Sequence, residues 1–576
     1  MQAHYTPIEK LPHHYLPATF RVESWEQLQP YFAELRARSI ESLEDLQQWL
    51  SDCSELEAAI SEDACWRQIK MTCDTENKEL EEAFNFFVTQ IQPHIQPYAD
   101  ALNRKLIECP YTAALDPAQF GTYLRNVRKS IDLFREENIP IQAELGVMQQ
   151  QFGQITGRMT IEHQGQEYTL QQAARFLQSK DRKEREAVYH KIQQRRLEDR
   201  QPLDELYTNL LVRRHQLALN AGFDNYRDYR FKELGRFDYG PAECEAFQQA
   251  VEQEILPLVN TIYEKKRAKL AIDSLRPWDL DAEPAHLEPL RPFNGGQDLL
   301  QKSIAVMEQL DPFFAGCFRT MEKMGHFDLE SRKGKAPGGY NCPLAESGAP
   351  FIFMNAAGQM DDVTTMVHEG GHAVHSFLAH QLPLTGFKEY PMEIAEVASM
   401  AMELFTMDYW QPFFSNPADL KRAKLHQLER CITIFPWIAT IDAFQHWVYL
   451  NPGHTPEQRL EAWQQINHRF TPKALDVSGL ENYRAYSWQR QLHLYEVPFY
   501  YIEYGIAQLG AIGLWQQFKQ NKEEALNHYR RALSLGGTKP LPELYKAAGL
   551  AFNFSANHIH NLVAFVQQQM EAIEQA

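Results

Sequence analysis

The residues best suited to chemistry lie between 364 and 377, where the chain reads TTMVHEGGHAVHSF. This segment contains the pattern HExxH, in which His368 and His372 are four residues apart and therefore share one face of a helix. Two imidazoles in this arrangement can bind one metal ion. Glu369, beside the first histidine, can take a proton from water activated at that ion. The motif predicts a metal site with its own general base.

The surroundings of this motif matter, because HExxH also arises by chance. Apolar residues flank it on both sides and predict a largely buried helix. Gly370 and Gly371 each weaken that helix by about 1 kcal/mol relative to alanine. Glycines at such positions indicate that a substrate or another backbone approaches closely. The alternative is a pair of core histidines satisfied by hydrogen bonds.

A catalytic zinc ion needs three protein ligands and an open position. The next predicted helix, EYPMEIAEVASMAMELF at 389–405, places Glu396 and Glu403 seven residues apart on one apolar face. Burying unpaired carboxylates there is costly unless a metal relieves the cost. We expect Glu396 to be the third ligand and Glu403 to hold the other N–H of a ligating imidazole. Surface or core positions are expected for Glu389, Glu393 and His375, although His375 is one turn beyond His372.

If water activated at such a metal attacks a carbonyl group, a donor that stabilises the resulting oxyanion is also required. The segment WQRQLHLYEVPFYYIEYGIAQLGA at 488–511 offers His493 and, on a helix expected to begin at Pro498, three tyrosines. These are Tyr500, Tyr501 and Tyr504. The alternative for such an aromatic cluster is simple core packing.

The elements that position these residues are mainly helical. Long amphipathic helices are predicted from about residue 24 to 191, with one β-hairpin at 158–170 turning at Gln164 and Gly165. The proline-rich segment 275–296 predicts an ordered loop. Residues 333–358 are glycine-rich and contain one apolar run, FIFM at 351–354, that suits a buried strand. Helices are expected to dominate from there to the C-terminus.

Composition excludes several classes of partner. The 576 residues include 76 acidic and 57 basic ones, a net charge of −19 that repels nucleic acid and anionic membranes. The eight cysteines show no CxxC and no disulfide framework. The N-terminus shows no signal peptide, and no apolar stretch reaches the ~20 residues that span a bilayer. We therefore expect a cytoplasmic protein.

HEGGHAVH followed by EVASMAME resembles the thimet oligopeptidase and oligoendopeptidase F family of zinc metallopeptidases. The family pattern is HExGHxxH with a glutamate in an ExxS segment some two dozen residues later. The resemblance implies that His368, His372 and Glu396 bind one zinc ion per chain, that Glu369 is the general base and that Glu403 supports a ligand. The proline usual before the family's serine is Ala398 here.

The same resemblance implies roles downstream and upstream of the metal. It favours Tyr504 first and Tyr501 second as oxyanion donors, with His493 as a substrate or transition-state contact. It also implies that the glycine-rich loop and the edge of the strand at 351–358 hold an extended peptide, since a strand edge pairs with any backbone. The substrate-binding residues expected on this basis are Gly338, Gly339, Tyr340 and Tyr500. A structural turn is the alternative for the loop.

The resemblance covers roughly residues 180–560, whereas the N-terminal segment matches only as a generic helical region. It implies a mainly α fold with two helical lobes flanking a deep substrate channel and a small β element near the zinc site. We divide the chain into an N-terminal helical lobe, 1–190, and a catalytic domain, 191–576. The implied activity is hydrolysis of internal bonds in short unstructured peptides by a monomer or small homo-oligomer.

Two other functions stay open from the sequence. One is a zinc carboxypeptidase or dipeptidyl carboxypeptidase, because related helical enzymes share HExxH and a later glutamate. The other is a non-catalytic, helical peptide-binding protein that keeps the metal for structure. Structural zinc sites usually have four protein ligands, often cysteines, and neither ligand segment contains a cysteine.

Overall fold

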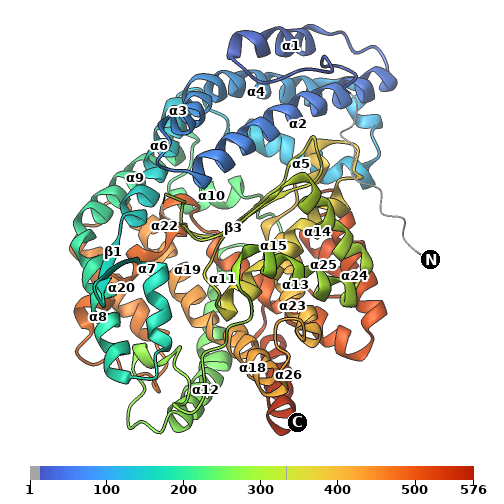
Figure 1. The fold of residues 1–576 in the computed structure, drawn as a ribbon. Helices are drawn as coiled ribbons and strands as arrows, with labels where there is room; N and C mark the ends of the chain where they lie inside the picture. Colours follow the sequence, from blue (N-terminus) through green and yellow to red (C-terminus); the bar gives the residue numbers. More distant parts are fainter. Residues whose placement is uncertain (1–12, 333) are drawn as a thin grey trace.

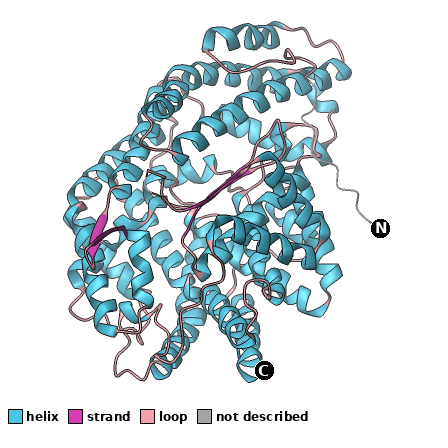
Figure 2. Cartoon of the chain, viewed as in Figure 1, coloured by secondary structure: helices cyan, strands magenta, loops and turns pink. Residues whose placement is uncertain are grey.

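The computed structural model describes residues 13–332 and 334–576. Within these residues the protein is mainly helical and carries only small sheets (Figures 1 and 2). The predicted mainly α fold is therefore confirmed. The expected lack of a signal peptide concerns the N-terminal segment, which, like Lys333 in the glycine-rich loop, lies outside the described residues.

The N-terminal helices begin with side-chain caps that the sequence supplies. Ser42 accepts a hydrogen bond from the N–H of Asp45 at the start of α2, and Asp116 accepts one from the N–H of Ala118 at the start of α5. The first four helices lie together at the top of Figure 1. The helices of this part are α1 (Trp25–Ala37), α2 (Leu43–Cys73), α3 (Lys78–Phe86), α4 (Gln92–Glu108), α5 (Pro117–Leu133) and α6 (Asn138–Gly157).

Two large hydrophobic cores hold the described chain together. The smaller one is built from apolar residues between Leu16 and Val127, with two residues added from a distant segment: Phe387 of helix α16 (Thr385–Lys388) and Leu384 directly before it. The larger one gathers apolar residues from Leu133 to Met570. The division between the cores thus falls near residue 130, and the lobe boundary at residue 190 stays a prediction.

The predicted hairpin is present as strands β1 (Thr160–His163) and β2 (Gln166–Thr169), which pair antiparallel. Its turn residues, Gln164 and Gly165, both have positive φ angles, 51° and 77°, as the tightest hairpin turns require. The helices that follow are α7 (Leu170–Ala174), α8 (Arg182–Glu198), α9 (Arg200–Asn220), α10 (Tyr226–Glu233), α11 (Pro241–Ala250) and α12 (Leu256–Lys269).

The proline-rich segment is largely irregular, as expected, between α12 and α13 (Gly295–Leu310). After α14 (Pro312–Met324) come strands β3 (Phe327–Glu330), β4 (Tyr340–Cys342) and β5 (Phe351–Ala356), in the order β3-β5-β4. The run at 351–354 is buried, as predicted. However, β5 pairs on both sides, parallel to β3 and antiparallel to β4. The free strand edge near the site is therefore that of β4, and the expectation that 351–358 supplies it is wrong.

Helices form the rest of the chain. They are α15 (Met360–Ala379), α16, α17 (Met392–Thr406), α18 (Pro417–Thr433), α19 (Phe435–Leu450), α20 (Pro456–Arg469), α21 (Glu481–Ala485), α22 (Leu492–Glu496), α23 (Tyr501–Gln520), α24 (Lys522–Ser534), α25 (Leu541–Ala547) and α26 (Ala556–Gln575). Across the part of the chain that the structure describes, every helix is too short or too polar to cross a membrane. All eight cysteines are free thiols.

Candidate active site

Helices α15 and α17 bring together the three predicted metal ligands. Nε2 of His368 lies 3.3 Å, and Nε2 of His372 lies 3.6 Å, from Oε2 of Glu396. Two ligands each about 2.0–2.1 Å from a tetrahedral zinc ion are roughly 3.3 Å apart. The donor atoms of all three side chains lie within 4.8 Å of one another. The arrangement therefore fits one ion held by two imidazoles and a carboxylate.

The two glycines of the motif are explained by packing on their helix. A Cβ on Gly371 would lie 2.4 Å from the carbonyl oxygen of Ala398, in the backbone of α17. A Cβ on Gly370 would lie 2.5 Å from the ring of Phe318. Contacts this short exclude a side chain at either position. Gly371 thus lets α17 approach α15 closely enough for Glu396 to reach the histidines.

A chain of hydrogen bonds orients His368. Its Nδ1 lies 2.7 Å from Oε1 of Glu403, as predicted from the sequence. The other oxygen of Glu403 accepts from Nε2 of Gln427 at 2.7 Å, and Oε1 of Gln427 accepts from Thr364 at 2.9 Å. An imidazole that donates Nδ1–H to a carboxylate presents the lone pair of Nε2 to a metal. Gln427 and Thr364 escaped the sequence analysis because ordinary polar residues carry no signal of such contacts.

Glu369 lies beside the ligands and is nearly inaccessible, with 6% of its surface exposed. Its Oε2 atom is buried and has no hydrogen-bond partner among the described residues. Burial raises the pKa of this carboxyl to about 7, because the charged form is poorly solvated. A free carboxylate oxygen with such a pKa can accept and release a proton near neutral pH.

A cavity of about 500 Å³ opens in front of these residues. It is lined by Ser61 of α2 on one side and by residues of β4, α15 and α17 on the other, so both cores contribute to its wall. Gly339 and Tyr340, two of the predicted substrate-binding residues, line it, whereas Gly338 does not appear in its wall. The cavity is large enough to hold several residues of an extended peptide.

Asn341 is a cavity residue that the sequence analysis missed. Its side-chain nitrogen donates to the backbone oxygen of Glu369 at 3.3 Å, while its Oδ1 has no partner among the described residues. Tyr340 next to it stacks on Phe353, with ring centroids 4.8 Å apart, and its hydroxyl lies 2.6 Å from that of Thr72 in α2. Edge strand β4 is thereby anchored to α2, with a free polar atom at the cavity.

The three tyrosines differ in position. Tyr500 donates a short hydrogen bond to Oε1 of the ligand Glu396. Tyr504 lines the cavity, as does Tyr500, whereas Tyr501 is absent from the cavity wall and 8% exposed. The helix begins at Tyr501 and not at Pro498 as expected, because Phe499 adopts a left-handed conformation with φ 64° that ends any helix there.

His493 is tied to Tyr504 by a relay whose proton positions can be derived. The indole N–H of Trp437, which can only donate, bonds to Oε1 of Gln491 at 2.8 Å. The amide nitrogen of Gln491 therefore faces Nδ1 of His493, 2.7 Å away, and that nitrogen must accept. Nε2 of His493 then carries the proton and donates to the Tyr504 hydroxyl at 3.2 Å. The hydroxyl proton of Tyr504 is left free for a ligand in the cavity.

Charge states agree with this relay. Burial lowers the pKa of His493 to about 4, so the ring is neutral near pH 7. Burial, together with the charge of Glu396, raises the pKa of Tyr504 well above its usual value, so the phenol stays protonated. Both groups can therefore act as neutral hydrogen-bond donors at physiological pH.

Of the remaining acidic and imidazole candidates, two are buried in the core and one lies at the cavity wall. Glu393 is buried and accepts a hydrogen bond from Tyr239 at 2.6 Å, away from the ligands. His375 is fully buried, stacks on Tyr390 with centroids 3.5 Å apart, and is absent from the cavity wall. Glu389 is exposed at the cavity wall.

The chemistry of the donor set fits zinc. Two imidazole nitrogens and one carboxylate oxygen form an open set with room for a further ligand, which is typical of catalytic zinc sites. Glu369, whose Oε2 has no partner among the described residues, lines the same cavity as the three ligands. Within a mainly helical protein, this arrangement is that of a helical metallopeptidase.

Comparison with known proteins gives the same class and a family. The sequence profile of peptidase family M3 matches residues 175–562, and that of the peptidase M3 N-terminal domain matches residues 17–134. The chain belongs to peptidase family M3, whose members are metallopeptidases that are generally zinc-dependent. The resemblance found in the sequence is confirmed, and it extends into the N-terminal helices, contrary to expectation.

Individual relatives are distant in sequence. An oligoendopeptidase F homolog of Borreliella burgdorferi is 23% identical over 389 residues, which cover 66% of this chain and 62% of that protein. Oligopeptidase PepF of Bacillus subtilis is 23% identical over 308 residues, 51% of this chain and 44% of that protein. The chain thus spans less than two thirds of these relatives' length. The solved structure of PZ peptidase A with an inhibitor is 26% identical, with a TM-score of 0.91 over 96% of this chain and 99% of that one.

Proposed function

We propose that the protein is a zinc-dependent oligoendopeptidase that hydrolyses internal bonds of short, unstructured peptides. The observation that carries this proposal is the convergence of His368, His372 and Glu396 beside the free, buried oxygen of Glu369 at the wall of the cavity. Bound zinc would supply Lewis-acid activation of water and of the scissile carbonyl. It would be held by the two histidines and Glu396, one ion at this site.

The residues of the chain provide the remaining steps. Glu369 takes the proton of the attacking water on its free oxygen and passes it to the leaving amine. Tyr504 donates a hydrogen bond from its free hydroxyl to the oxyanion, and His493 keeps that hydroxyl oriented. Tyr500 holds Glu396 in place and also lines the cavity, where it would contact the substrate as expected from the sequence.

Substrate binding would use edge strand β4. Its backbone can pair with an extended peptide whatever the side chains of that peptide are. A Cβ on Gly339 would lie 3.8 Å from Oε1 of Glu369, so the absence of a side chain there keeps the peptide path to the base open. Tyr340 and Asn341 flank this path. Gly338 has a positive φ of 97°, which serves the turn before the strand.

The test is cleavage of a peptide of about eight residues, blocked at both ends, with and without chelator, beside a folded protein. Internal cuts that stop on chelation, with the folded protein left intact, support the proposal. Products released only from peptides with a free C-terminus would favour a carboxypeptidase. Equal cleavage of the folded protein would contradict the proposed restriction to short, unstructured peptides.

The place of action is proposed from the thiols. Eight free cysteines suit a reducing compartment, so we propose the cytoplasm. An acidic net charge of −19 favours neutral or basic peptides over nucleic acid as partners.

A further inference from the structure

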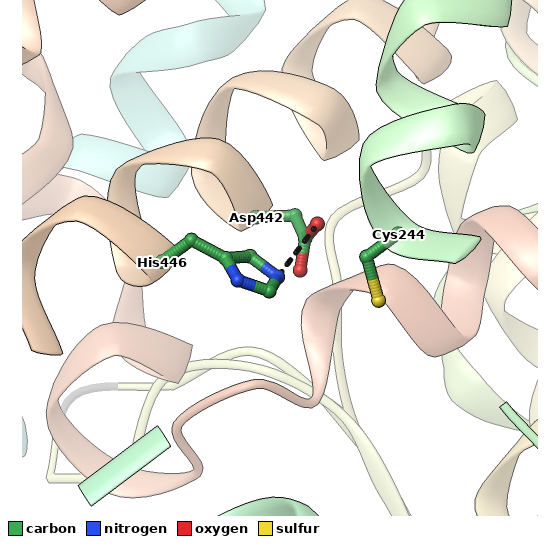
Figure 3. Close-up of side chains that lie close together, drawn as sticks. All are labelled: Cys244, Asp442 and His446. Atoms are coloured by element: carbon green, nitrogen blue, oxygen red, sulfur yellow. Dashed lines mark ion pairs between the residues drawn. The ribbon is translucent and has the colours of Figure 1, made fainter. Parts of the chain in front are cut away.

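A second group of metal-ligating side chains lies outside the active site. Cys244 of α11 faces Asp442 and His446 of α19, and one donor atom of each lies within 4.8 Å of the others (Figure 3). All three side chains are buried, with 1%, 0% and 7% of their surfaces exposed. Among the described residues, only this group and the HExxH ligands form such a cluster.

The polar atoms of this group lack protein partners. Oδ1 of Asp442 and both ring nitrogens of His446 are buried without a hydrogen bond among the described residues. Three orphaned polar atoms in one place are costly, because each has lost its water. A single cation bound between Asp442 and His446 would pair the buried carboxylate and one imidazole nitrogen together. The nearby guanidinium of Arg236 satisfies none of them: its Nη2 pairs with Glu503 at 2.9 Å, and its Nε and Nη1 have no partner among the described residues.

The spacing of the donors matches that of two ligands of one ion. Nε2 of His446 lies 3.6 Å from Oδ2 of Asp442, too long for a good hydrogen bond. The same distance, 3.6 Å, separates Nε2 of His372 from Oε2 of Glu396 in the active site. Gln248, one turn beyond Cys244, donates to Oδ2 of Asp442 at 2.7 Å. Such a bond orients a carboxylate in the way that outer groups of metal sites do.

From this geometry we infer that Cys244, Asp442 and His446 bind a second zinc ion, with a structural role. A thiolate, an imidazole and a carboxylate form a donor set that favours zinc over calcium or magnesium. Burial of all three residues leaves no path for a peptide, so the site differs from the open HExxH site. Structural zinc sites usually have a fourth protein ligand; the described residues offer three here, so a buried water would take the fourth position of a tetrahedral ion.

The ion would stabilise the turn that presents the catalytic tyrosines. The ring of His446 packs against Phe499, with centroids 5.4 Å apart. The neighbouring Gln445 accepts a hydrogen bond from the N–H of Phe499 at 3.1 Å. Phe499 is the residue with φ 64° directly before Tyr500. Joining α11 to α19 behind this turn would hold its strained backbone in place.

The inference is tested on the full-length protein by metal analysis and by cobalt substitution. We expect two zinc ions per wild-type chain and one in His368→Ala, in which the active site is disabled. Cobalt in the second site should give a thiolate charge-transfer absorption, which the cysteine-free HExxH site cannot give. That absorption should vanish in Cys244→Ser and persist in Cys431→Ser, a change at another buried cysteine.

One zinc per wild-type chain, or a thiolate absorption that survives Cys244→Ser, overturns the second site. If Cys244→Ser does not fold, crystals of the wild-type protein decide. An anomalous zinc peak next to the sulfur of Cys244 supports the site, and its absence from zinc-saturated crystals overturns it. Peptidase activity is not part of these readouts, so failure here leaves the proposed function untouched.

Discussion

The amide nitrogen of Gln491 lies 2.7 Å from Nδ1 of His493, and the bond of the same amide to Trp437 fixes which atom faces the histidine. This contact determines the tautomer of His493 and thereby the direction of the hydroxyl proton of Tyr504. Gln491→Glu should reverse the tautomer of His493, because a carboxylate would draw the proton to Nδ1 and leave Nε2 to accept from Tyr504. We expect kcat to fall about 10²-fold with KM nearly unchanged. Gln491→Ala attracts no proton to Nδ1, so kcat should fall less in this variant. Equal losses of kcat in both variants would contradict the relay.

Tyr504 and Tyr501 should respond differently to loss of the hydroxyl. Tyr504→Phe removes the proposed oxyanion donor at the cavity, so kcat should fall about 10²–10³-fold while KM changes little. Tyr501→Phe serves as the control, because Tyr501 is buried and absent from the cavity wall. Steady-state kinetics on one blocked peptide compares them. A larger loss for Tyr501→Phe would restore the second choice made from the sequence.

Glu369→Gln should abolish activity without releasing the metal. The amide cannot accept the proton of the attacking water, and we expect kcat to fall by about 10²–10⁴-fold or more. Metal content per chain should equal that of the wild type, since Glu369 is not a ligand. Full activity in this variant would disprove the assigned base, and loss of metal would make it a ligand.

The pH dependence of activity should reflect Glu369 and not His493. Burial raises the pKa of Glu369 to about 7, and a bound divalent cation would lower it again. The base must be deprotonated, so kcat/KM should rise with pH through an apparent pKa at or below about 7. The pKa of His493 is lowered to about 4, so His493→Gln should reduce the rate but leave the rise of kcat/KM with pH unchanged. If the rise of kcat/KM with pH disappears in His493→Gln, the titrating group is the imidazole of His493 and not Glu369.

Glu403→Gln should weaken zinc binding while the fold is retained. The carboxylate that accepts from Nδ1 of His368 would be lost, and partners of this kind typically contribute 10–100-fold in metal affinity. The affinity can be measured by competition with a chromogenic chelator. Glu393→Gln is the matched control, because Glu393 is buried on the same helix but bonds to Tyr239. Similar losses in both would mean that the effect is one of general stability.

The local sequence determined the parts of this protein that depend on helix geometry. The spacing of four residues placed His368 and His372 on one face, and the apolar face of the next helix singled out Glu396 and Glu403. Turn chemistry at Gln164 and Gly165 predicted the hairpin. These features follow from contacts within a few residues, where the covalent chain itself sets the geometry.

The tertiary structure decided what depends on residues far apart in the chain. Only the folded protein shows that Gly371 sits against the backbone at Ala398, or that Gln427 supports Glu403 across 24 residues. Likewise, only the order of the strands shows that β5 is paired on both edges, with β3 and with β4. The free strand edge near the site therefore belongs to β4. The cluster of Cys244 with Asp442 had no local pattern at all. Such contacts arise from packing of whole helices, which no short window of sequence encodes.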